Sequence, residues 1–545
     1  MKDTKTYEPL KKDPTNTYKN RLVNLIRPWK NVDKTVSHRL YQRLYPTSCT
    51  PPKFYGLPKI HKTNMPLRPI VSGIGSVTEG CAKHLAQILN AVKGKNSHAI
   101  KDSHDFVKKI QHLVIPADHH LVSFDVSALF TSIPIDYAVE AVRKKLTADN
   151  SWRDLTELNL EQVLQLLELC LSTTYFMYGG QFFRQKFGAP MGSPISPGVA
   201  DLSMEIFEEE ALSVCPQSIK PLVWYRYVDD TFTVLKKDSV EDFTTFLNSR
   251  NEHIQFTRET EEENKLAFLD TCVHHLPSGH IKTTVYRKPT HTDQYLNWDS
   301  NHHLDHKRSV VRTLLNRADT HITEAEDKVK EVEHVKTVLK ANGYKHWALN
   351  IPNQKNKDLR EKKKREQGTS ATPQPPLGLP YIQGLSEELQ RVFKKHDINI
   401  YHKPGNTLRS FLVKPKDPTP TVNKCGVVYN INCNSCDDSY IGETARSLGQ
   451  RFQEHQTHDQ SAIKEHLSAS GHSVSLDDVR ILTSEARLDA RKVKEAIEIY
   501  KRRPSLNRDQ GVEIPPILLQ LVNRLPNTNR EAGGGPGARH RTGSL

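Results

Sequence analysis

The chain has 545 residues, enough for two to four domains, and carries a formal net charge of +14. It has no run of about 18 apolar residues, and its charged start, MKDTKTYEPLKKDP, lacks an apolar core, so we expect neither a membrane span nor a secretory signal. The surplus of Lys and Arg favours a polyanionic partner such as nucleic acid, with a merely basic surface as the alternative. Eight cysteines, three of them between Cys425 and Cys436, indicate a reducing compartment and a local metal cluster instead of a disulfide framework.

The character of the sequence changes along the chain, which predicts a multidomain protein of α/β and α+β class. Residues 1–50 are polar and basic, and residues 51–290 alternate strand-like runs such as LVSFDV with helical stretches such as LNLEQVLQLLELCLSTTYF. Residues 291–354 have helical spacing. The remaining segments are a basic and Pro-rich linker (355–380), a connecting helical segment (381–422), a compact last domain (423–510) and a tail expected to be disordered (511–545). Within the linker, Lys362 to Arg365 fits either a nuclear localisation signal or a solvated basic run.

The stretch LVWYRYVDDTFTVL predicts a β-hairpin with Asp229 and Asp230 at its turn. A pair of acids in a hairpin is usually only a solvated turn, so other residues must decide its role. Asp125 ends an apolar strand in HHLVSFDVSALFTSIP, and a strand tip can face such a hairpin. Together Asp125 and Asp229 could hold two Mg²⁺ ions and promote attack of a primer 3′-hydroxyl on a nucleoside triphosphate.

Between these carboxylates lies FGAPMGSPISPGVADL. Its small residues, Gly188, Gly192 and Ser193, would let the backbone approach a base pair or phosphate closely. With Met191 between them, this segment is expected to form one wall of a nucleotide pocket.

The C-terminal stretch CGVVYNINCNSCDDSYIGETARSLGQRFQEH predicts two short strands that contain Tyr429 and Tyr440, followed by a helix. Arg451 and His455 lie four residues apart and therefore on one helical face. Farther along, Glu495 lies in a predicted helix, and Asn507 follows Pro504. These six side chains form a coherent hydrolytic set, in which Glu495 could hold one Mg²⁺ and Arg451 could neutralise a phosphate. The alternative is a small α/β domain whose tyrosines are core residues.

The loop between the two predicted strands contains Cys433 and Cys436, which form half of a tetrahedral zinc site. The segment AIKEHLSASGH supplies His466 and His472 as the other two ligands. Cys425 is a spare thiol that could replace one of the histidines.

Seven ordered blocks resemble those of Penelope-like retroelement polyproteins, whose polymerase is related to the telomerase reverse transcriptase. The blocks are FYGLPKIHK (54–62), RPIVS (68–72), FDVSALFTSIP, GAPMGSPISP, YVDD, LAFLD (266–270) and YRKPTHTDQYL (286–296). The resemblance implies right-hand fingers and a palm over residues 51–290 and a helical thumb over 291–354. Family members usually carry a further block upstream, so residues 1–50 are expected to be a shortened N-terminal part of the fingers.

Matched to this family, Asp125, Asp229 and Asp230 are the catalytic carboxylates, Asp230 being the less essential one. Phe130, five residues after Asp125, matches the aromatic gate that rejects a 2′-hydroxyl. The resemblance also implies that Lys59, Lys62 and Arg68 bind triphosphate or template, with ordinary surface charge as the alternative. Lys265 could be the general acid that protonates pyrophosphate, or simply a charged loop end.

The last domain resembles GIY-YIG nucleases, although VVY replaces GIY. The match implies that Tyr429 and Tyr440 orient or deprotonate water, that Arg451 binds phosphate and that His455 assists proton transfer. It also implies that Glu495, and not the nearby Glu498, ligates the metal, and that the CCHH zinc site is structural.

The combined resemblance implies a nuclear retrotransposon enzyme that is both an RNA-directed DNA polymerase and a DNA endonuclease. Its expected partners are template RNA, target DNA and deoxynucleoside triphosphates, and its expected cofactors are Mg²⁺ or Mn²⁺ and Zn²⁺. The nuclease would nick DNA and so create a primer for target-primed reverse transcription, and the linker would hold the nicked end near the palm. Two alternatives remain: a decayed or domesticated nucleic-acid-binding protein, or a nuclease whose polymerase is disabled by a short N-terminus.

Overall fold

A computed structural model describes residues 6–47, 49–60, 64–350, 376–404, 407–412 and 415–524. Lys62, the basic run 362–365 and the tail beyond residue 524 lie outside these ranges. None of the helices in the described ranges combines the length and apolarity needed to cross a membrane.

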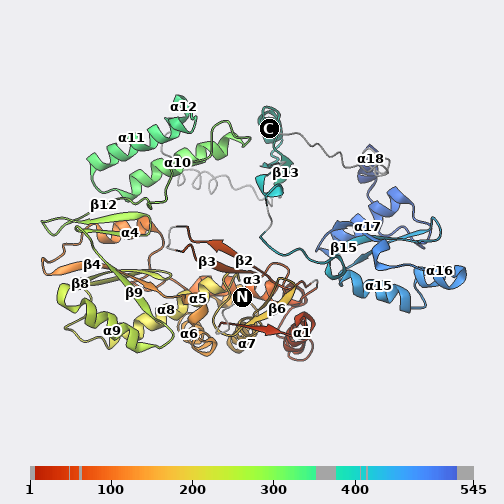
Figure 1. The fold of residues 1–545 in the computed structure, drawn as a ribbon, viewed down its shortest axis with the longest axis horizontal. Helices are drawn as coiled ribbons and strands as arrows, with labels where there is room; N and C mark the ends of the chain where they lie inside the picture. Colours follow the sequence, from red (N-terminus) through yellow and green to blue (C-terminus); the bar gives the residue numbers. More distant parts are fainter. Residues whose placement is uncertain are drawn as a thin grey trace, which may run out of the picture.

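The N-terminal body, residues 7–285, contains a five-stranded and a four-stranded sheet joined by a helical layer, and a smaller three-stranded sheet at its end (Figure 1). The five-stranded sheet has the order β1-β6-β5-β2-β3, and the four-stranded sheet has the order β7-β8-β4-β9. The first comprises β1 (Tyr7–Leu10), β6 (Gln181–Gln185), β5 (Tyr175–Tyr178), β2 (Lys53–Pro58) and β3 (Leu67–Ser72). The second comprises β7 (Val223–Tyr227), β8 (Asp230–Lys236), β4 (His119–Val126) and β9 (Phe256–Thr260).

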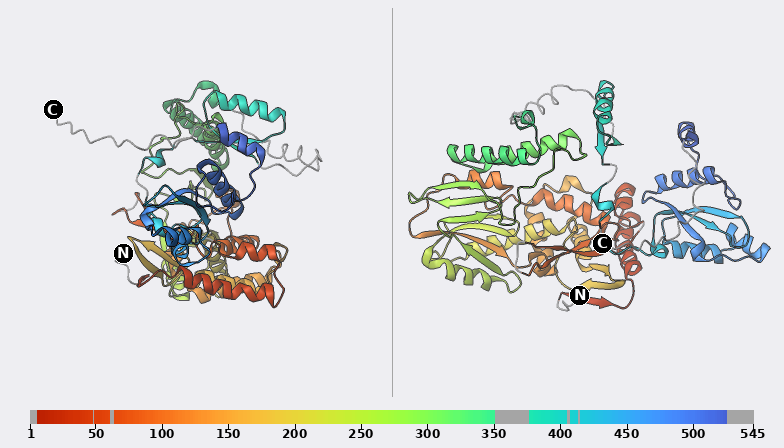
Figure 2. Two further views of the ribbon diagram at one scale, coloured as in Figure 1. Left: turned by 90° about the vertical axis from the view of Figure 1, so that its right-hand side faces the viewer. Right: turned by 45° about the horizontal axis from the view of Figure 1, so that its top comes forward.

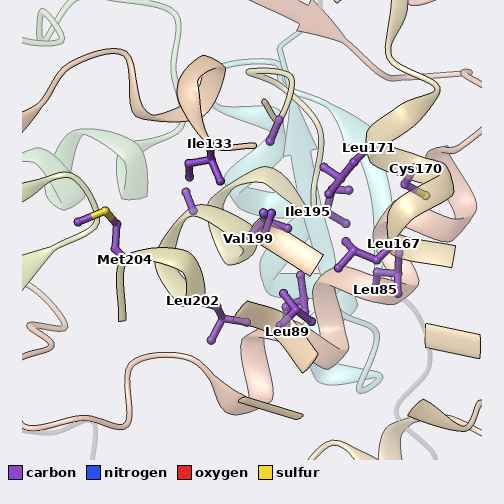
Figure 3. Packing of buried hydrophobic residues seen from close by; sticks show 14 of the residues in the cluster. Leu85, Leu89, Ile133, Leu167, Cys170, Leu171, Ile195, Val199, Leu202 and Met204 are labelled. Atoms are coloured by element: carbon purple, nitrogen blue, oxygen red, sulfur yellow. The ribbon is translucent and has the colours of Figure 1, made fainter. Parts of the chain in front are cut away.

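Helices α3 (Glu79–Val92), α6 (Ile135–Ala148), α7 (Leu160–Ser172) and α8 (Ser196–Ser213) contribute many residues of the main apolar core. Figure 3 shows the part of this core where α3, α7 and α8 meet. Leu85 and Leu89 of α3 lie beside Leu167 of α7 and Val199 of α8, all buried. Helix α7 begins at a capping box, in which the side chains of Asn159 and Gln162 each accept a hydrogen bond from the other residue's backbone N–H. The body's helices are α1 (Thr15–Asn31), α2 (His38–Leu44), α3 (Glu79–Val92), α4 (Ser103–Ile110), α5 (Leu129–Ser132), α6 (Ile135–Ala148), α7 (Leu160–Ser172), α8 (Ser196–Ser213) and α9 (Val240–Arg250).

Residues 6–47 are part of the body, so the predicted boundary at residue 50 does not separate two structural units. Strand β1 pairs with β6 in the five-stranded sheet, and α1 and α2 contribute buried residues such as Leu22, Ile26 and Leu44 to the main core. This pairing joins residues more than 170 positions apart, which no local sequence pattern reveals.

A helical unit follows the body, as the spacing of residues 291–354 predicts. It comprises α10 (Leu304–His321), α11 (Ala325–Ala341) and α12 (His346–Leu349), which share a small core around Val311, Leu339 and Tyr344. The base of α10 is held against the three-stranded sheet of β10 (Lys265–Phe268), β11 (Thr271–His275) and β12 (Ile281–Val285).

Residues 376–424, which we call the connector, contain more than the predicted linker and helix. Strand β13 (Leu377–Pro380) pairs in parallel with β14 (Ile400–Lys403) across α14 (Leu385–Lys395), so the predicted linker ends before residue 377.

The C-terminal domain forms a separate unit beyond the connector (Figure 2). Its sheet has the order β16-β15-β17, built from β16 (Ser439–Thr444), β15 (Val427–Asn432) and β17 (Val479–Ser484). Its helices are α15 (Leu448–Thr457), α16 (Ala462–Ser470) and α17 (Leu488–Arg502). Helix α18 (Pro516–Arg524) occupies part of the tail predicted to be disordered, so that prediction is wrong for residues 516–524.

Candidate active sites

The three acidic residues predicted for the body meet at one end of the four-stranded sheet. Asp125 lies near the end of β4, directly opposite Asp230 at the start of β8, and Asp229 lies in the turn between β7 and β8. Burial, followed by the charges of Asp229 and Asp125, raises the pKa of Asp230 to about 6. Carboxylates that crowd one another in this way fit a divalent cation, because bound positive charge relieves their repulsion.

The turn that carries Asp229 has a strained backbone, and the buried Arg226 holds it by a hydrogen bond. Val228 has φ = +58°, a conformation that costs a β-branched residue roughly 1–2 kcal/mol. The guanidinium of Arg226 donates to the Val228 carbonyl oxygen at 2.9 Å and to carboxylate oxygens of Glu208 and Asp201, each at 2.7 Å. Arg226 is 1% exposed, and Glu208 is also buried, so this ion-pair network fixes the turn from inside the protein.

A cavity of about 820 Å³ opens in front of the acidic residues. Asp125 and Asp229 line one side of it, whereas Asp230 does not contribute to the lining. The other predicted residues that line it are Lys59 just after β2, Arg68 of β3, Phe130 of α5, and Met191, Gly192 and Ser193 from the loop before α8. This loop is tied to β3, because the Val71 N–H donates to the Met191 carbonyl oxygen at 2.8 Å.

Besides Asp230, two predicted residues do not line this cavity. Lys265 lies at the start of β10, with a side chain that is 54% exposed and 4.0 Å from a Glu263 carboxylate oxygen. Gly188 has φ = +71°, and a Cβ there would lie 2.3 Å from the Phe130 carbonyl oxygen, so this glycine serves packing behind Phe130 instead of an approach to substrate. Sequence reasoning missed Lys288, whose charge opposes the rise in the pKa of Asp230.

In the C-terminal domain, the predicted tyrosines lie on adjacent antiparallel strands, β15 and β16. Tyr429 is fully buried, and its hydroxyl lies 2.7 Å from His455 Nε2 and 3.3 Å from Arg451 Nε. Burial raises the pKa of Tyr429 above its usual range, and burial together with Arg451 lowers the pKa of His455 to about 4. A neutral His455 whose Nδ1–H donates to Ser461 Oγ, 3.0 Å away, accepts a hydrogen bond from Tyr429 at Nε2.

A second cavity, of about 720 Å³, brings together Tyr440, Arg451, His455 and Glu495. Burial, then the charge of Glu443, raises the pKa of Glu495 to about 7. Glu498, on the same helix, instead binds Arg502 at 2.8 Å, so the structure directs Glu495 and not Glu498 into the cavity. Glu454 and Asp509 also line this cavity, and Arg451 donates to Glu454 at 3.1 Å. A partly buried carboxylate near an arginine, as at Glu495, fits one hard divalent cation and a phosphate.

Arg491, close to Glu495 on α17, is a charged residue that escaped the sequence reasoning. It is fully buried and donates from Nε to Glu443 at 2.5 Å and from Nη1 to the carbonyl oxygens of Glu485 and Ala486. A buried arginine in a predicted amphipathic helix gives no sequence signal of this role, because its partner lies 48 residues earlier.

Asn507 was predicted to be catalytic, but its amide is engaged with the backbone. Asn507 Nδ2 donates to the Ile441 carbonyl oxygen and Asn507 Oδ1 accepts from the Ile441 N–H, both at 2.8 Å. Although Asn507 also borders the second cavity, these paired bonds make it a positioning residue for β16.

The four predicted zinc ligands converge at the end of the β15–β16 hairpin. Within the described residues, Cys433, Cys436, His466 and His472 are the single group whose donor atoms could surround a metal, all within 4.8 Å of one another. Cys433 Sγ lies 3.4 Å from both His466 Nε2 and His472 Nδ1, and Cys436 Sγ lies 3.6 Å from His466 Nε2. Ligands of tetrahedral zinc lie about 3.3–3.8 Å apart, so the group fits this ion.

Cys425 takes no part in this group. Its thiol donates to the Cys49 carbonyl oxygen at 3.5 Å and so contacts the body.

Residues 11–270 match the family described as reverse transcriptase (RNA-dependent DNA polymerase), and residues 294–353 match the family described as animal helix-turn-helix domain. The first match covers just under half of the chain and supports a reverse transcriptase domain over these residues. It starts at residue 11, in agreement with the observed membership of α1 in the body. No curated protein matches the chain.

Solved structures with distant similarity include two telomerases and a viral polymerase. Telomerase from Candida albicans, in complex with a fragment of telomeric RNA, is 10% identical over 62% of each chain, with a TM-score of 0.40. Telomerase from Candida tropicalis, truncated from its C-terminal domain, is 13% identical over 49% of this chain and 60% of its own, with a TM-score of 0.33. The BmCPV RNA-dependent RNA polymerase is 13% identical over 63% of this chain and 30% of its own, with a TM-score of 0.36. The chain thus spans less than two thirds of these proteins.

Proposed function

We propose that the chain is a bifunctional enzyme of a Penelope-like retroelement, in which the body is an RNA-directed DNA polymerase and the C-terminal domain is a GIY-YIG DNA endonuclease. One observation carries the proposal: the chain has two separate cavities, each lined by carboxylates suited to Mg²⁺ or Mn²⁺ and by cations suited to phosphate. The reverse transcriptase family match supports the first half.

In the polymerase cavity, Asp125 and Asp229 would hold the divalent cations, with Asp230 beside them. These ions supply charge neutralisation and a lowered pKa for a primer 3′-hydroxyl. Lys59 and Arg68, on the opposite wall, bind the triphosphate of an incoming deoxynucleotide. Phe130 occupies the space next to the sugar and excludes a 2′-hydroxyl.

In the nuclease cavity, Glu495 would hold a single divalent cation, and Arg451 binds the scissile phosphate of target DNA. Tyr440 lines this cavity, whereas Tyr429 reaches it through its hydrogen bonds with His455 and Arg451. We therefore assign the orientation of the attacking water to Tyr440. The hydrogen-bonded pair of Tyr429 and His455 would hold a proton at the edge of the cavity.

The zinc group lies outside the residues that line this cavity, which supports a structural role for the ion. It joins the β15–β16 hairpin to α16 and the segment after it, so bound zinc would stabilise the fold of this domain.

The joint presence of the two sites supports target-primed reverse transcription, in which a nick made by one site primes synthesis by the other on a template RNA. Because the target of such a reaction is chromosomal DNA, we also propose that the protein acts in the nucleus.

Separation-of-function variants test the proposal. We expect Asp229→Ala to abolish primer extension on an RNA template while DNA nicking remains, and Glu495→Gln to do the reverse. The matched controls are Asp238→Ala, an exposed acid after β8, and Glu498→Gln, three residues beyond Glu495 on α17. If both activities disappear in a folded single variant, the two-site proposal is wrong. A parent protein that binds RNA but has neither activity would instead favour the domesticated binding protein.

A further inference from the structure

Trp347, in the short helix α12, is the most exposed of the five tryptophans in the chain. Its side chain is 54% exposed, whereas Trp29, Trp152 and Trp224 are buried and Trp298 is half-buried. Tryptophan is highly buried on average in soluble proteins, and an indole left at the surface is typical of binding interfaces. The helical unit therefore presents an aromatic ring whose exposure the fold alone does not explain.

The exposed ring of Trp347 is held in place by a packed aromatic cluster. Trp298 lies edge-on to Trp347, with ring centroids 5.5 Å apart and planes at 83°, and Tyr344 lies edge-on to Trp298 with centroids 5.2 Å apart. The ammonium group of Lys307 lies 5.5 Å from the centre of the Trp298 ring, and Tyr344 is part of the buried core of the helical unit. This support gives Trp347 a fixed orientation, as a stacking surface requires.

A cation lies against the same ring. The guanidinium carbon of Arg308 is 5.6 Å from the centre of the Trp347 ring. Arg308 Nη1 is also 4.0 Å from a carboxylate oxygen of Asp305, whose side chain is 60% exposed. Surface ion pairs of this kind are weak, so the charge of Arg308 remains available to an anion.

The chain around Trp347 is basic. The acids of α11 all precede residue 334, and two of them are paired: Asp327 binds Lys282 at 3.0 Å and Glu331 binds Arg287 at 2.9 Å. Residues 334–350 contain no acidic residue and carry three lysines, Lys336, Lys340 and Lys345. The positive charge of the helical unit is thus concentrated at the end that carries Trp347, which favours a polyanion there.

This basic aromatic end is remote from the polymerase cavity. The residues that line that cavity all precede residue 258. Helix α10 lies between the body and both α11 and α12 in Figure 1, and its C-terminal end is the one held to the body, where Arg317 and His321 each lie 3.4 Å from a carboxylate oxygen of Asp270. Arg308 precedes His321 by 13 residues, which is about 20 Å along the helix.

We propose that Trp347, Arg308 and the lysines of residues 334–350 form a binding site for an unpaired nucleic-acid strand, in which a base stacks on the indole and the phosphates lie against the cations. A ring face next to cations suits a nucleic acid better than a protein partner, for which an apolar patch without surplus charge would suffice. An unpaired strand exposes its base faces, whereas a duplex hides them inside the stack. Single-stranded RNA and single-stranded DNA share this chemistry. The proposal goes beyond the two catalytic activities and depends on neither.

The test is tryptophan fluorescence of the full-length protein titrated with oligo(U) and oligo(dT) of about eight nucleotides. A base stacked on an indole quenches its emission, and three of the other four tryptophans are buried, so we expect both probes to quench the parent. Trp347→Phe keeps an aromatic ring in the cluster and should abolish the quenching, which would exclude Trp298 as its source. Tighter binding of oligo(U) would assign the site to RNA, and tighter binding of oligo(dT) would assign it to DNA.

Two exposed lysines of the helical unit form a matched pair of variants. Lys345→Ala removes a cation beside Trp347, so the Kd obtained from quenching should rise about threefold and the slope of log Kd against log salt should fall by about 0.7. Lys330→Ala, in the first half of α11, is the control and should change neither value. Equal effects of the two substitutions would overturn the assignment of the phosphate contacts to this end of the unit.

A blunt duplex of the same length and Asp229→Ala complete the test. The duplex should leave the fluorescence of Trp347 unchanged, and Asp229→Ala should retain full quenching by the single strands, because the site is separate from the polymerase carboxylates. The proposal is wrong if single strands fail to quench the parent, if the duplex quenches as strongly, or if quenching persists in Trp347→Phe. Failure of the polymerase proposal would show instead as a parent that lacks primer extension but is still quenched by single strands.

Discussion

The substitution Arg226→Met tests whether the buried guanidinium positions the turn that carries Asp229. Its removal leaves Glu208 buried and without its counter-charge, since Glu208 is fully buried and Asp201 only 14% exposed. Breaking a buried ion pair from one side costs about 3–5 kcal/mol. A typical unfolding free energy is about 5–15 kcal/mol, so the variant should fold at low temperature but unfold at clearly lower urea concentration.

A compensating variant distinguishes stability from catalysis. The triple variant Arg226→Met/Glu208→Gln/Asp201→Asn removes all three charges of the network. The Trp224 Nε1–H can still donate to the side-chain amide oxygen introduced by Glu208→Gln, so most of the lost stability should return. The hydrogen bond from residue 226 to the Val228 carbonyl oxygen stays lost, which frees a strained turn. We therefore expect kcat for extension to remain at least about tenfold below the parent value while the KM for deoxynucleotides changes little.

Urea unfolding and steady-state primer extension measure the two effects separately. Arg226→Lys is the conservative control, because it keeps the charge but cannot reach the carboxylates and the carbonyl oxygen together. The reasoning fails if Arg226→Met costs less than about 1 kcal/mol, or if the triple variant recovers stability and full activity together.

Three further predictions concern single groups. Phe130→Ala should admit ribonucleotides, and unchanged selection between ribo- and deoxynucleotides in primer extension would exclude its role as a gate. Cys436→Ser should lose zinc and unfold the C-terminal domain, whereas Glu495→Gln should keep about one zinc per chain and lose only nicking, as zinc analysis and circular dichroism can show. Because the folded state lowers the pKa of His455 to about 4, the free energy of unfolding that His455 contributes is complete above its ordinary pKa near 6.5 and is lost as the pH falls through about 4. A plot of the domain's free energy of unfolding against pH should therefore fall less steeply between these pH values in His455→Gln than in the parent.

The sequence predicts the local parts of both sites well. The YVDD turn, the end of β4 at Asp125 and the two tyrosine strands follow from short-range alternation and turn chemistry, and the structure has all of them. The helical face shared by Arg451 and His455 follows from the spacing of four residues.

What the sequence does not predict depends on contacts between distant segments. The pairing of β1 with β6, and of Arg491 with Glu443, requires knowledge of which elements become neighbours. Lys265 was predicted from its position directly before LAFLD. In the structure it lies on the three-stranded sheet, whereas the carboxylates lie on the four-stranded sheet, so it does not line the polymerase cavity. Asn507 is a polar residue of the kind found in active sites, but only the fold shows that its side-chain amide is hydrogen-bonded to the backbone of Ile441.

The connector is fastened to the five-stranded sheet at Asp417, whose carboxylate accepts from the Gly179 N–H and whose carbonyl oxygen accepts from Lys53 Nζ, both at 2.7 Å. This fastening bears on how the two proposed sites would cooperate. Nine residues lie between Asp417 and Val427, where the first strand of the C-terminal domain begins. This interval is itself held, because the Leu448 N–H donates to the Lys424 carbonyl oxygen and Cys425 contacts Cys49. Because Leu448 starts the helix that carries Arg451 and His455, the anchor at Asp417 sets the position of the nuclease side chains relative to the polymerase body. Loss of that anchor should therefore impair transfer of a nicked end to the polymerase.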